Sequence, residues 1–136
     1  MFITAAGQLL HFPASAVRVQ GRSASGVTGI KCTDSAVIFF GVVEPAGENI
    51  VVTVSGSSQA LPGTEAGNGK VSDFSEYPGK GRATAGVRSH KFRSGEDTLS
   101  RAWCGPTPAR AATSSGTPAY LPESDGKRDG TGTPLP

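Results

Sequence analysis

The chain has 136 residues and a formal net charge of only +2, which suits one ordinary domain and excludes two full-sized ones. Its 19 glycines and 10 prolines, beside 36% hydrophobic residues, favour short strands and many turns over long helices. The sequence has no run of about 18 apolar residues, so we expect no membrane-spanning helix.

The N-terminal stretch and the cysteines indicate the compartment. MFITAAGQLLHF has neither a basic n-region nor a small-residue cleavage site after it, so we expect no signal peptide. Cys32 and Cys104 follow no metal-binding or disulfide spacing, which favours two reduced thiols over a disulfide. We therefore expect a cytoplasmic protein without a cofactor or a metal site.

Three stretches share the pattern Thr-x-x-Gly-x4-apolar-Pro, with a small residue just before the glycine. They are TAAGQLLHFP (4–13), TVSGSSQALP (53–62) and TSSGTPAYLP (113–122). Glycine permits the positive φ of a tight hairpin turn, and the closing proline cannot donate to a strand ladder. Each copy therefore predicts a β-hairpin that ends at its proline.

A second element follows the hairpins and also recurs. GRSASGVTGIK (21–31) returns sixty positions later as GRATAGVRSHK (81–91), and GKRDGTG (126–132) is a shortened third copy. Strand candidates come after the first two copies, at Ala36–Val43 and Asp97–Trp103. A repeat of about 50 residues is typical of propeller blades, and a unit with four strands fits one blade.

The repeats divide the chain into three units. We expect a first blade at 2–49, a second at 50–104 with a loop insertion near 62–73, and a truncated third with a flexible tail at 105–136. An array this short cannot close a ring, so at least one strand edge is expected to stay unpaired. The residues expected to be most buried are Leu9, Phe12, Val27, Ile30, Val37, Phe39, Val52, Val87, Phe92, Leu99 and Trp103.

Basic residues gather on the repeated Gly-Arg segments. No acidic residue lies between Arg18 and Lys31 or between Gly79 and Arg93. If the blades surround an axis, these segments line one rim, and a positive rim follows phosphates without reading bases. The candidate DNA-binding residues are Arg18, Arg22, Lys31, Lys80, Arg82, Arg88, Lys91 and Arg93.

Other interpretations of the same residues stay open. The basic segments are also compatible with an ordinary solvated surface, and the arginine of each Gly-Arg pair with a strut between blades. His90 is expected on a loop, within possible reach of a phosphate. Trp103 and the pair Phe39 and Phe40 are expected in the core between blades, with base stacking as the alternative.

The repeated pattern resembles a known family. The hairpin motif followed by Gln-Gly-Arg-x-x-x-Gly-Val-x-x-Ile-Lys (20–31) is similar to the blade repeat of the C-terminal β-pinwheel of bacterial type IIA topoisomerase A subunits, those of gyrase and topoisomerase IV. The resemblance implies an all-β fold, here a partial β-pinwheel of about two and a half four-stranded antiparallel blades. It also implies binding and bending of duplex DNA along the basic edge, with the remaining topoisomerase subunits as possible partners.

The sequence also departs from that family. Gyrase A subunits carry a diagnostic motif, the gyrase box Gln-Arg-Arg-Gly-Gly-Lys-Gly. Residues 20–26 of this chain match it at only three of seven positions, which favours the topoisomerase IV branch. Tyr77 lies in a turn-like stretch and Tyr120 in the third hairpin, so neither has the setting of the cleavage tyrosine. We expect no enzyme activity from this chain alone. A protein-interaction module and a non-functional remnant of a truncated topoisomerase gene are the alternatives.

Overall fold

The computed structural model describes residues 1–33, 35–61, 63–64, 66–124 and 126–136. Pro62, the closing proline of the second hairpin motif, lies outside the described residues. No helix in the described ranges is long and apolar enough to cross a membrane.

The described chain is built from short strands and two single-turn 3₁₀ helices. In chain order they are β1 (Phe2–Thr4), β2 (Gln8–Leu10), η1 (Ala14–Ala16), β3 (Val37–Phe40), β4 (Asn49–Gly56), β5 (Asn68–Asp73), η2 (Phe74–Glu76), β6 (Val87–Arg88), β7 (Thr98–Pro106), β8 (Ala111–Ala112), β9 (Pro118–Ala119) and β10 (Thr133–Pro134).

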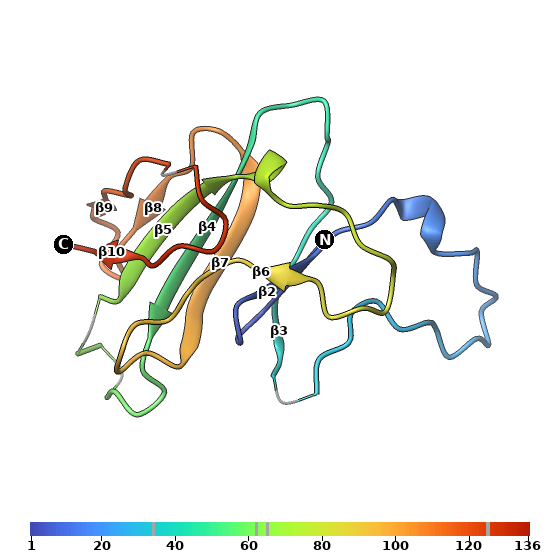
Figure 1. Cartoon of the computed structure of the whole chain (residues 1–136), viewed down its shortest axis with the longest axis horizontal. Helices are drawn as coiled ribbons and strands as arrows, with labels where there is room; N and C mark the ends of the chain where they lie inside the picture. The colour runs from blue at the N-terminus through green and yellow to red at the C-terminus, as the bar shows by residue number, and fades with distance from the viewer. Residues whose placement is uncertain (34, 62, 65, 125) are drawn as a thin grey trace.

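The strands form three antiparallel sheets. Sheet A has the order β3-β1-β2-β6, sheet B has the order β10-β5-β4-β7, and β8 and β9 pair as sheet C. Sheets A and B lie next to each other, and sheet C stands at the far end of sheet B (Figure 1). The predicted all-β fold is confirmed, and the two strand candidates that follow the Gly-Arg segments appear as β3 and β7.

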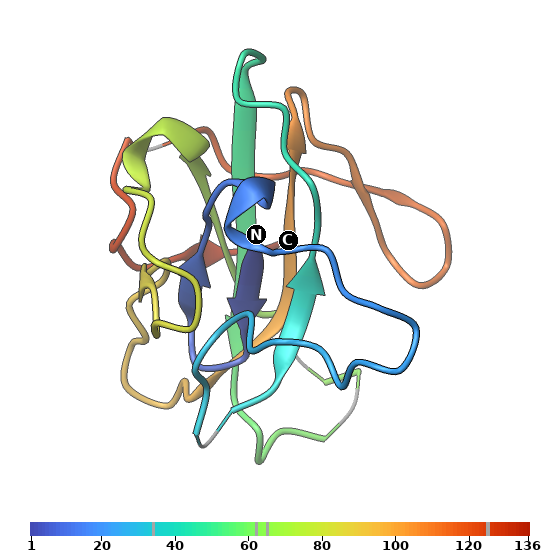
Figure 2. The ribbon, with the colours of Figure 1, turned by 90° about the vertical axis from the view of Figure 1, so that its right-hand side faces the viewer.

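The first and third hairpin motifs fold as predicted. In the first, Ile3 pairs with Leu9 across a turn at Gly7, whose φ is 83°. In the third, Ala112 pairs with Pro118, and Gly116 has a φ of 86°. Because glycine reaches this left-handed region without steric cost, the motif glycine sets the turn in both hairpins. Hairpin β8–β9 projects from the rest of the molecule (Figure 2).

The second hairpin corrects the predicted position of the insertion. Strand β4 pairs with β5 over six residue pairs, from Ile50 opposite Asp73 to Ser55 opposite Asn68. Residues 68–73, predicted to lie in a surface loop, therefore form a central and largely buried strand of sheet B. The extra residues instead connect β4 to β5, at 57–67. The polar composition of β5 suggested a loop, but its long partner strand β4 supplies a ladder that outweighs this preference.

Sheet A receives its last strand from the second repeat. Val87 of β6 pairs with Leu9 of β2, and the Ser89 N–H donates to the Gly7 carbonyl at 2.7 Å. Gly86 makes this approach possible, because a Cβ at its position would lie 2.3 Å from the Leu9 carbonyl oxygen. The first repeat therefore completes its sheet only by accepting a strand from the second, so the units predicted at 2–49 and 50–104 are not separate sheets.

Sheet B repeats this strand exchange in the same register. Thr133 of β10 pairs with Gly69 of β5, and the Leu135 N–H donates to the Gly67 carbonyl at 3.0 Å. Gly132 precedes β10 as Gly86 precedes β6, and a Cβ there would lie 2.8 Å from the β5 backbone. The C-terminal tail is thus the last strand of sheet B. Its predicted flexibility is wrong from residue 130 onwards, because backbone pairing outweighs its glycine-rich composition.

The core lies where sheets A and B meet. Its buried cluster consists of Ile3, Leu9, Val51, Tyr77, Leu99 and Cys104. Among the residues predicted to be most buried, Leu9, Ile30, Val52 and Leu99 are confirmed.

The prediction of burial is wrong for three residues of this set. Val27, Val37 and Trp103 are each exposed to between 37% and 41%, and Phe40, expected between blades, is 64% exposed. Val37, Phe40 and Trp103 lie on the edge strands β3 and β7, which have a hydrogen-bonded neighbour on one side only. The hydrophobic pattern identified these strands correctly but did not show that they lie at the edges of their sheets.

The strand exchange predicts different effects of one substitution at two matched glycines. Gly26 and Gly86 occupy equivalent places in the repeat and both have positive φ, but a Cβ at Gly26 would meet nothing within 4 Å. Gly86→Ala adds a collision with β2 to the shared backbone strain, so it is expected to lower the free energy of unfolding by about 1–3 kcal/mol more than Gly26→Ala does. Urea denaturation of the two variants measures this difference, and equal stabilities would contradict the exchanged strand.

Candidate nucleic-acid interface

The three Gly-basic segments lie against one another in series, and we call residues 21–31, 81–91 and 126–131 together the loop row. The Lys31 N–H donates to the Thr84 carbonyl at 2.9 Å, which joins the first segment to the second. The Lys91 N–H donates to the Gly130 carbonyl at 2.9 Å, which joins the second to the third. In both contacts the donor is the backbone N–H of the lysine that ends the repeated segment.

A guanidinium strengthens each contact between neighbouring segments. Arg82 Nη1 donates to the Thr28 carbonyl at 2.7 Å, and Arg128 Nη1 donates to the Arg88 carbonyl at 3.0 Å. Both arginines are half-buried. The arginine of the second Gly-Arg pair therefore acts as a strut between repeats, through a backbone carbonyl, as one of the alternative interpretations proposed.

The other candidate DNA-binding residues present their side chains to solvent. Arg88 lies on β6, and the rest lie on connecting segments. The Lys80 backbone N–H donates to the His11 carbonyl at 3.2 Å, so that segment is anchored although its side chain is exposed. The exposed residues of this set are Arg18, Arg22, Lys31, Lys80, Arg88, Lys91 and Arg93.

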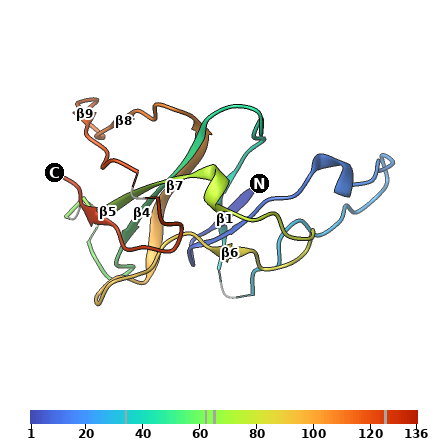
Figure 3. The ribbon, with the colours of Figure 1, turned by 45° about the horizontal axis from the view of Figure 1, so that its top comes forward.

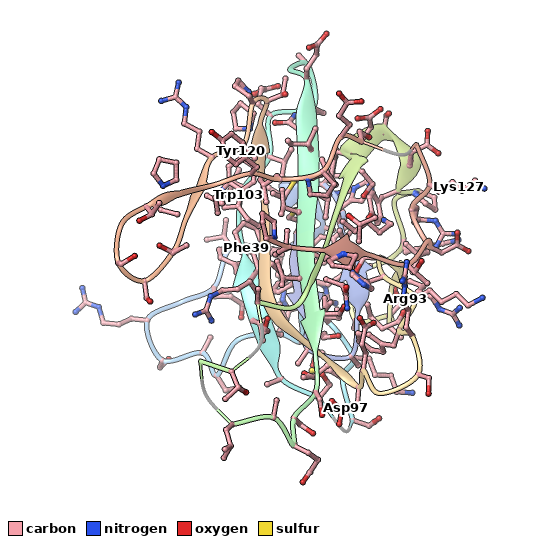
Figure 4. All side chains as sticks on the ribbon, turned by 90° about the vertical axis from the view of Figure 1, so that its left-hand side faces the viewer. Phe39, Arg93, Asp97, Trp103, Tyr120 and Lys127 are labelled. Carbon is pink, nitrogen blue, oxygen red and sulfur yellow. The ribbon has the colours of Figure 1, made fainter. Side chains whose placement is uncertain are left out.

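The tail adds basic residues that the sequence argument left out. Arg93 Nη2 donates to Thr131 Oγ1 at 3.3 Å, which brings Arg93 to the third segment, where Lys127 and Arg128 are found. In Figure 4, Arg93 and Lys127 lie on the same side of the molecule, away from Tyr120 and Trp103. The shortened copy at 126–132 already indicated a third basic segment. Its acidic neighbours and the expected flexibility of the tail argued against counting its lysine and arginine as candidates.

The carboxylate of Glu96 lies among these basic groups. Glu96 accepts hydrogen bonds from the Arg93 backbone N–H, at 2.8 Å, and from the Asn68 side chain. Burial alone raises the pKa of Glu96, but hydrogen bonds from the Arg93 backbone and from Ser55 and Asn68 outweigh burial and hold the pKa below its ordinary value. Glu96 therefore stays ionised near neutral pH and offsets part of the local positive charge.

A buried lysine ties sheet B to the loop row. Lys70, on β5, is only 2% exposed. Its Nζ donates to the Ser89 carbonyl at 3.1 Å and to the Arg128 carbonyl at 2.7 Å. One ammonium group thus holds the second and third segments together. The charge of Lys70 therefore stabilises the fold and is not presented to solvent.

His90 is buried rather than exposed on a loop. It is 1% exposed, and its Nδ1 lies 2.8 Å from Thr53 Oγ1 of β4. Its Nε2 is buried without a hydrogen-bond partner in the described part of the chain. Burial, and next the charge of Lys70, lower the pKa of His90 to about 4. The neutral ring therefore points inward from the loop row against β4, beyond the reach of a phosphate.

The remaining reactive side chains form no further site. Both cysteines are free, and burial raises the pKa of Cys104 to about 11, so its thiol stays protonated. Within the described ranges no three His, Cys, Asp or Glu side chains come together as a metal site.

Comparison with known proteins gives the family context for this geometry. A family model described as the DNA gyrase C-terminal domain, beta-propeller, matches residues 1–39 and 63–102, more than half of the chain. The chain is 41% identical over 92 residues to the DNA gyrase A subunit of Salmonella typhimurium and 39% identical over 94 residues to that of Klebsiella oxytoca. It is 33% identical over 91 residues to that of Escherichia coli. Each match covers 67% of this chain but only 9% of the relative.

The buried histidine predicts a pH dependence of stability. Because the pKa of His90 is about 4 in the folded chain and about 6.5 when unfolded, the unfolded state takes up the proton first as the pH falls. Its contribution is fully present above pH 6.5, and on the order of 1–2 kcal/mol is lost between pH 6.5 and pH 5. Urea denaturation at both pH values measures the loss.

His90→Asn is the matched control, since its amide keeps a polar atom near Thr53 Oγ1 but does not titrate. We expect the loss of stability between pH 6.5 and pH 5 to be smaller in this variant. An unchanged pH dependence would show that other groups cause it.

Proposed function

Since this chain belongs to the DNA gyrase C-terminal domain family, with its β-propeller fold, we propose that its loop row binds the phosphate backbone of duplex DNA. A cytoplasmic location on the nucleoid accompanies this function. The chain acts as a DNA-binding fragment, and the family match reaches no catalytic region. DNA cleavage, strand passage and ATP hydrolysis belong to other parts of such enzymes.

The observation that carries the proposal is the serial contact of the three Gly-basic segments. Backbone hydrogen bonds from Lys31 and Lys91 hold neighbouring segments together, so exposed cations from distant parts of the sequence are carried on adjoining segments. A duplex presents regularly spaced phosphates, which a fixed line of cations neutralises better than scattered ones. The side chains proposed to contact DNA are Arg18, Arg22, Lys31, Lys80, Arg88, Lys91, Arg93 and Lys127.

Arg82 has a different part in this proposal. Its guanidinium already donates to the Thr28 carbonyl, so its main effect is to position the segment that carries Arg88 and Lys91. Any contact of Arg82 with a phosphate uses the nitrogens left over from that bond. Replacing it should therefore weaken DNA binding and stability together, whereas replacing Lys91 should weaken DNA binding alone.

We propose that the chain belongs to the gyrase branch of the family. The three relatives compared are gyrase A subunits. The weak match to the gyrase box at 20–26 favours topoisomerase IV instead, which remains the alternative branch. Without that box in these repeats, the fragment binds and bends DNA only slightly and does not itself wrap it tightly.

Fluorescence anisotropy on a labelled duplex at several salt concentrations tests the proposal. The exposed contacts are phosphate contacts, so we expect no sequence preference and a dissociation constant on the order of 10⁻⁴ to 10⁻⁶ M near physiological salt. With roughly four to six phosphates neutralised, the logarithm of the binding constant should fall against the logarithm of salt with a slope of about −4 to −5.

Charge reversal locates the surface. Lys91→Glu is expected to weaken binding to all duplexes equally and to make the salt slope shallower by about 1. Arg110→Glu, on the exposed segment leading into hairpin β8–β9, is the matched control and should have a much smaller effect. Equal losses from both changes would place the binding surface elsewhere. No binding even at low salt would leave a protein-interaction module as the better explanation.

A further inference from the structure

The connection between β6 and β7 turns back on itself at residues 93–96. The Glu96 N–H donates to the Arg93 carbonyl at 3.0 Å, which closes a four-residue turn. In Figures 1 and 3 this connection, coloured yellow to orange, leaves β6 and doubles back into β7 beside the ends of β4 and β5. The turn carries Arg93, one of the side chains proposed to contact DNA.

The side chain of Glu96 fixes the backbone of this turn. Its carboxylate accepts a hydrogen bond from the Arg93 backbone N–H at 2.8 Å, so the turn is closed a second time from the side chain. The same carboxylate accepts hydrogen bonds from the side chains of Asn68, on β5, and Ser55, on β4. One partly buried carboxylate thus holds the backbone of Arg93 against the end of sheet B.

The guanidinium of Arg93 reaches the loop row from this fixed backbone. Arg93 is exposed, and its Nη2 donates to Thr131 Oγ1 at 3.3 Å, in the third segment. Asn68, which donates to Glu96, pairs with Pro134 of β10, the strand that continues the third segment. An arginine whose backbone is already held loses less conformational freedom when it binds a phosphate, so a fixed turn favours binding.

We propose that Glu96 is a positioning residue for DNA binding, because it holds Arg93 where the guanidinium meets a phosphate. This inference rests on the DNA binding proposed above. On charge alone, a carboxylate beside the surface repels a phosphate and weakens binding. The positioning effect has the opposite sign, so substitutions that separate charge from geometry distinguish the two.

Glu96→Gln and Glu96→Ala remove the same charge but differ in geometry. Glutamine keeps an oxygen that accepts from the Arg93 N–H, and the Asn68 amide can turn to present its oxygen to the new amide. Alanine keeps no acceptor. In the anisotropy assay Glu96→Gln should bind duplex about twofold more tightly than wild type, since only repulsion is lost.

Glu96→Ala should instead bind about fivefold more weakly near physiological salt, with a salt slope shallower by about 1, as expected for the loss of one phosphate contact. Asp97→Ala is the matched control, since it removes a neighbouring exposed carboxylate that bonds to Ser58 and not to Arg93. This control should not weaken binding. Equal dissociation constants for Glu96→Gln and Glu96→Ala would overturn the positioning role.

A double-mutant cycle tests whether Glu96 acts through Arg93. Arg93→Ala alone should weaken binding about fivefold, and adding Glu96→Ala should weaken it no further. If the two losses add, Glu96 acts on binding by another route and the proposal is wrong.

Amide hydrogen exchange at Arg93 gives a measurement without DNA. The Arg93 N–H should exchange slowly in wild type, Glu96→Gln and Asp97→Ala and fast in Glu96→Ala, with circular dichroism showing that each variant folds. Absence of wild-type binding even at low salt would overturn the proposed function and the role of Glu96 together. Wild-type binding that Arg93→Ala leaves unchanged, or that Glu96→Ala strengthens, would overturn the role of Glu96 alone.

Discussion

Backbone pairing between the outer edge of one hairpin and the strand of the next repeat holds this molecule together. Each four-stranded sheet is short, and its last strand has only two residues, so neither repeat completes a sheet from its own sequence. The pairing requires a close approach at Gly86 and again at Gly132, where a side chain would collide with the neighbouring strand. Because the added strands continue the Gly-basic segments, the same pairing that completes the sheets also aligns the loop row.

The arrangement explains why charges of one sign are tolerated side by side. Arg82 and Arg128 donate hydrogen bonds to backbone carbonyls of the preceding repeat, and Lys70 is buried between segments where its ammonium meets two carbonyl oxygens. These cations are structural. The exposed cations next to them present their side chains to solvent, and Glu96, which accepts a hydrogen bond from the Arg93 backbone N–H, lies beside them. The proposed DNA binding thus depends on the fold for the order of its contacts.

Sequence patterns predicted the local features better than the pairing between repeats. The Thr-x-x-Gly hairpins at 4–13 and 113–122 and the strand candidates leading to β3 and β7 follow from local residue preferences, and they are confirmed. The polar strand β5, the paired tail and the buried His90 could not be predicted, because each owes its position to a partner strand elsewhere in the chain that no local pattern identifies. For the same reason, the sequence located the basic segments and offered a strut as one role for Arg82, but it did not identify the Thr28 carbonyl as the partner of Arg82.

Amide hydrogen exchange followed by NMR tests the exchanged strands most directly, since it measures the protection of single backbone N–H groups. The account predicts slow exchange at Ser89 and Leu135, whose N–H groups donate to Gly7 and Gly67, and fast exchange at Val27, which is exposed in the first segment of the loop row. Exchange at Ser89 and Leu135 as fast as at Val27 would contradict the exchange of strands between repeats, and with it the alignment of the loop row.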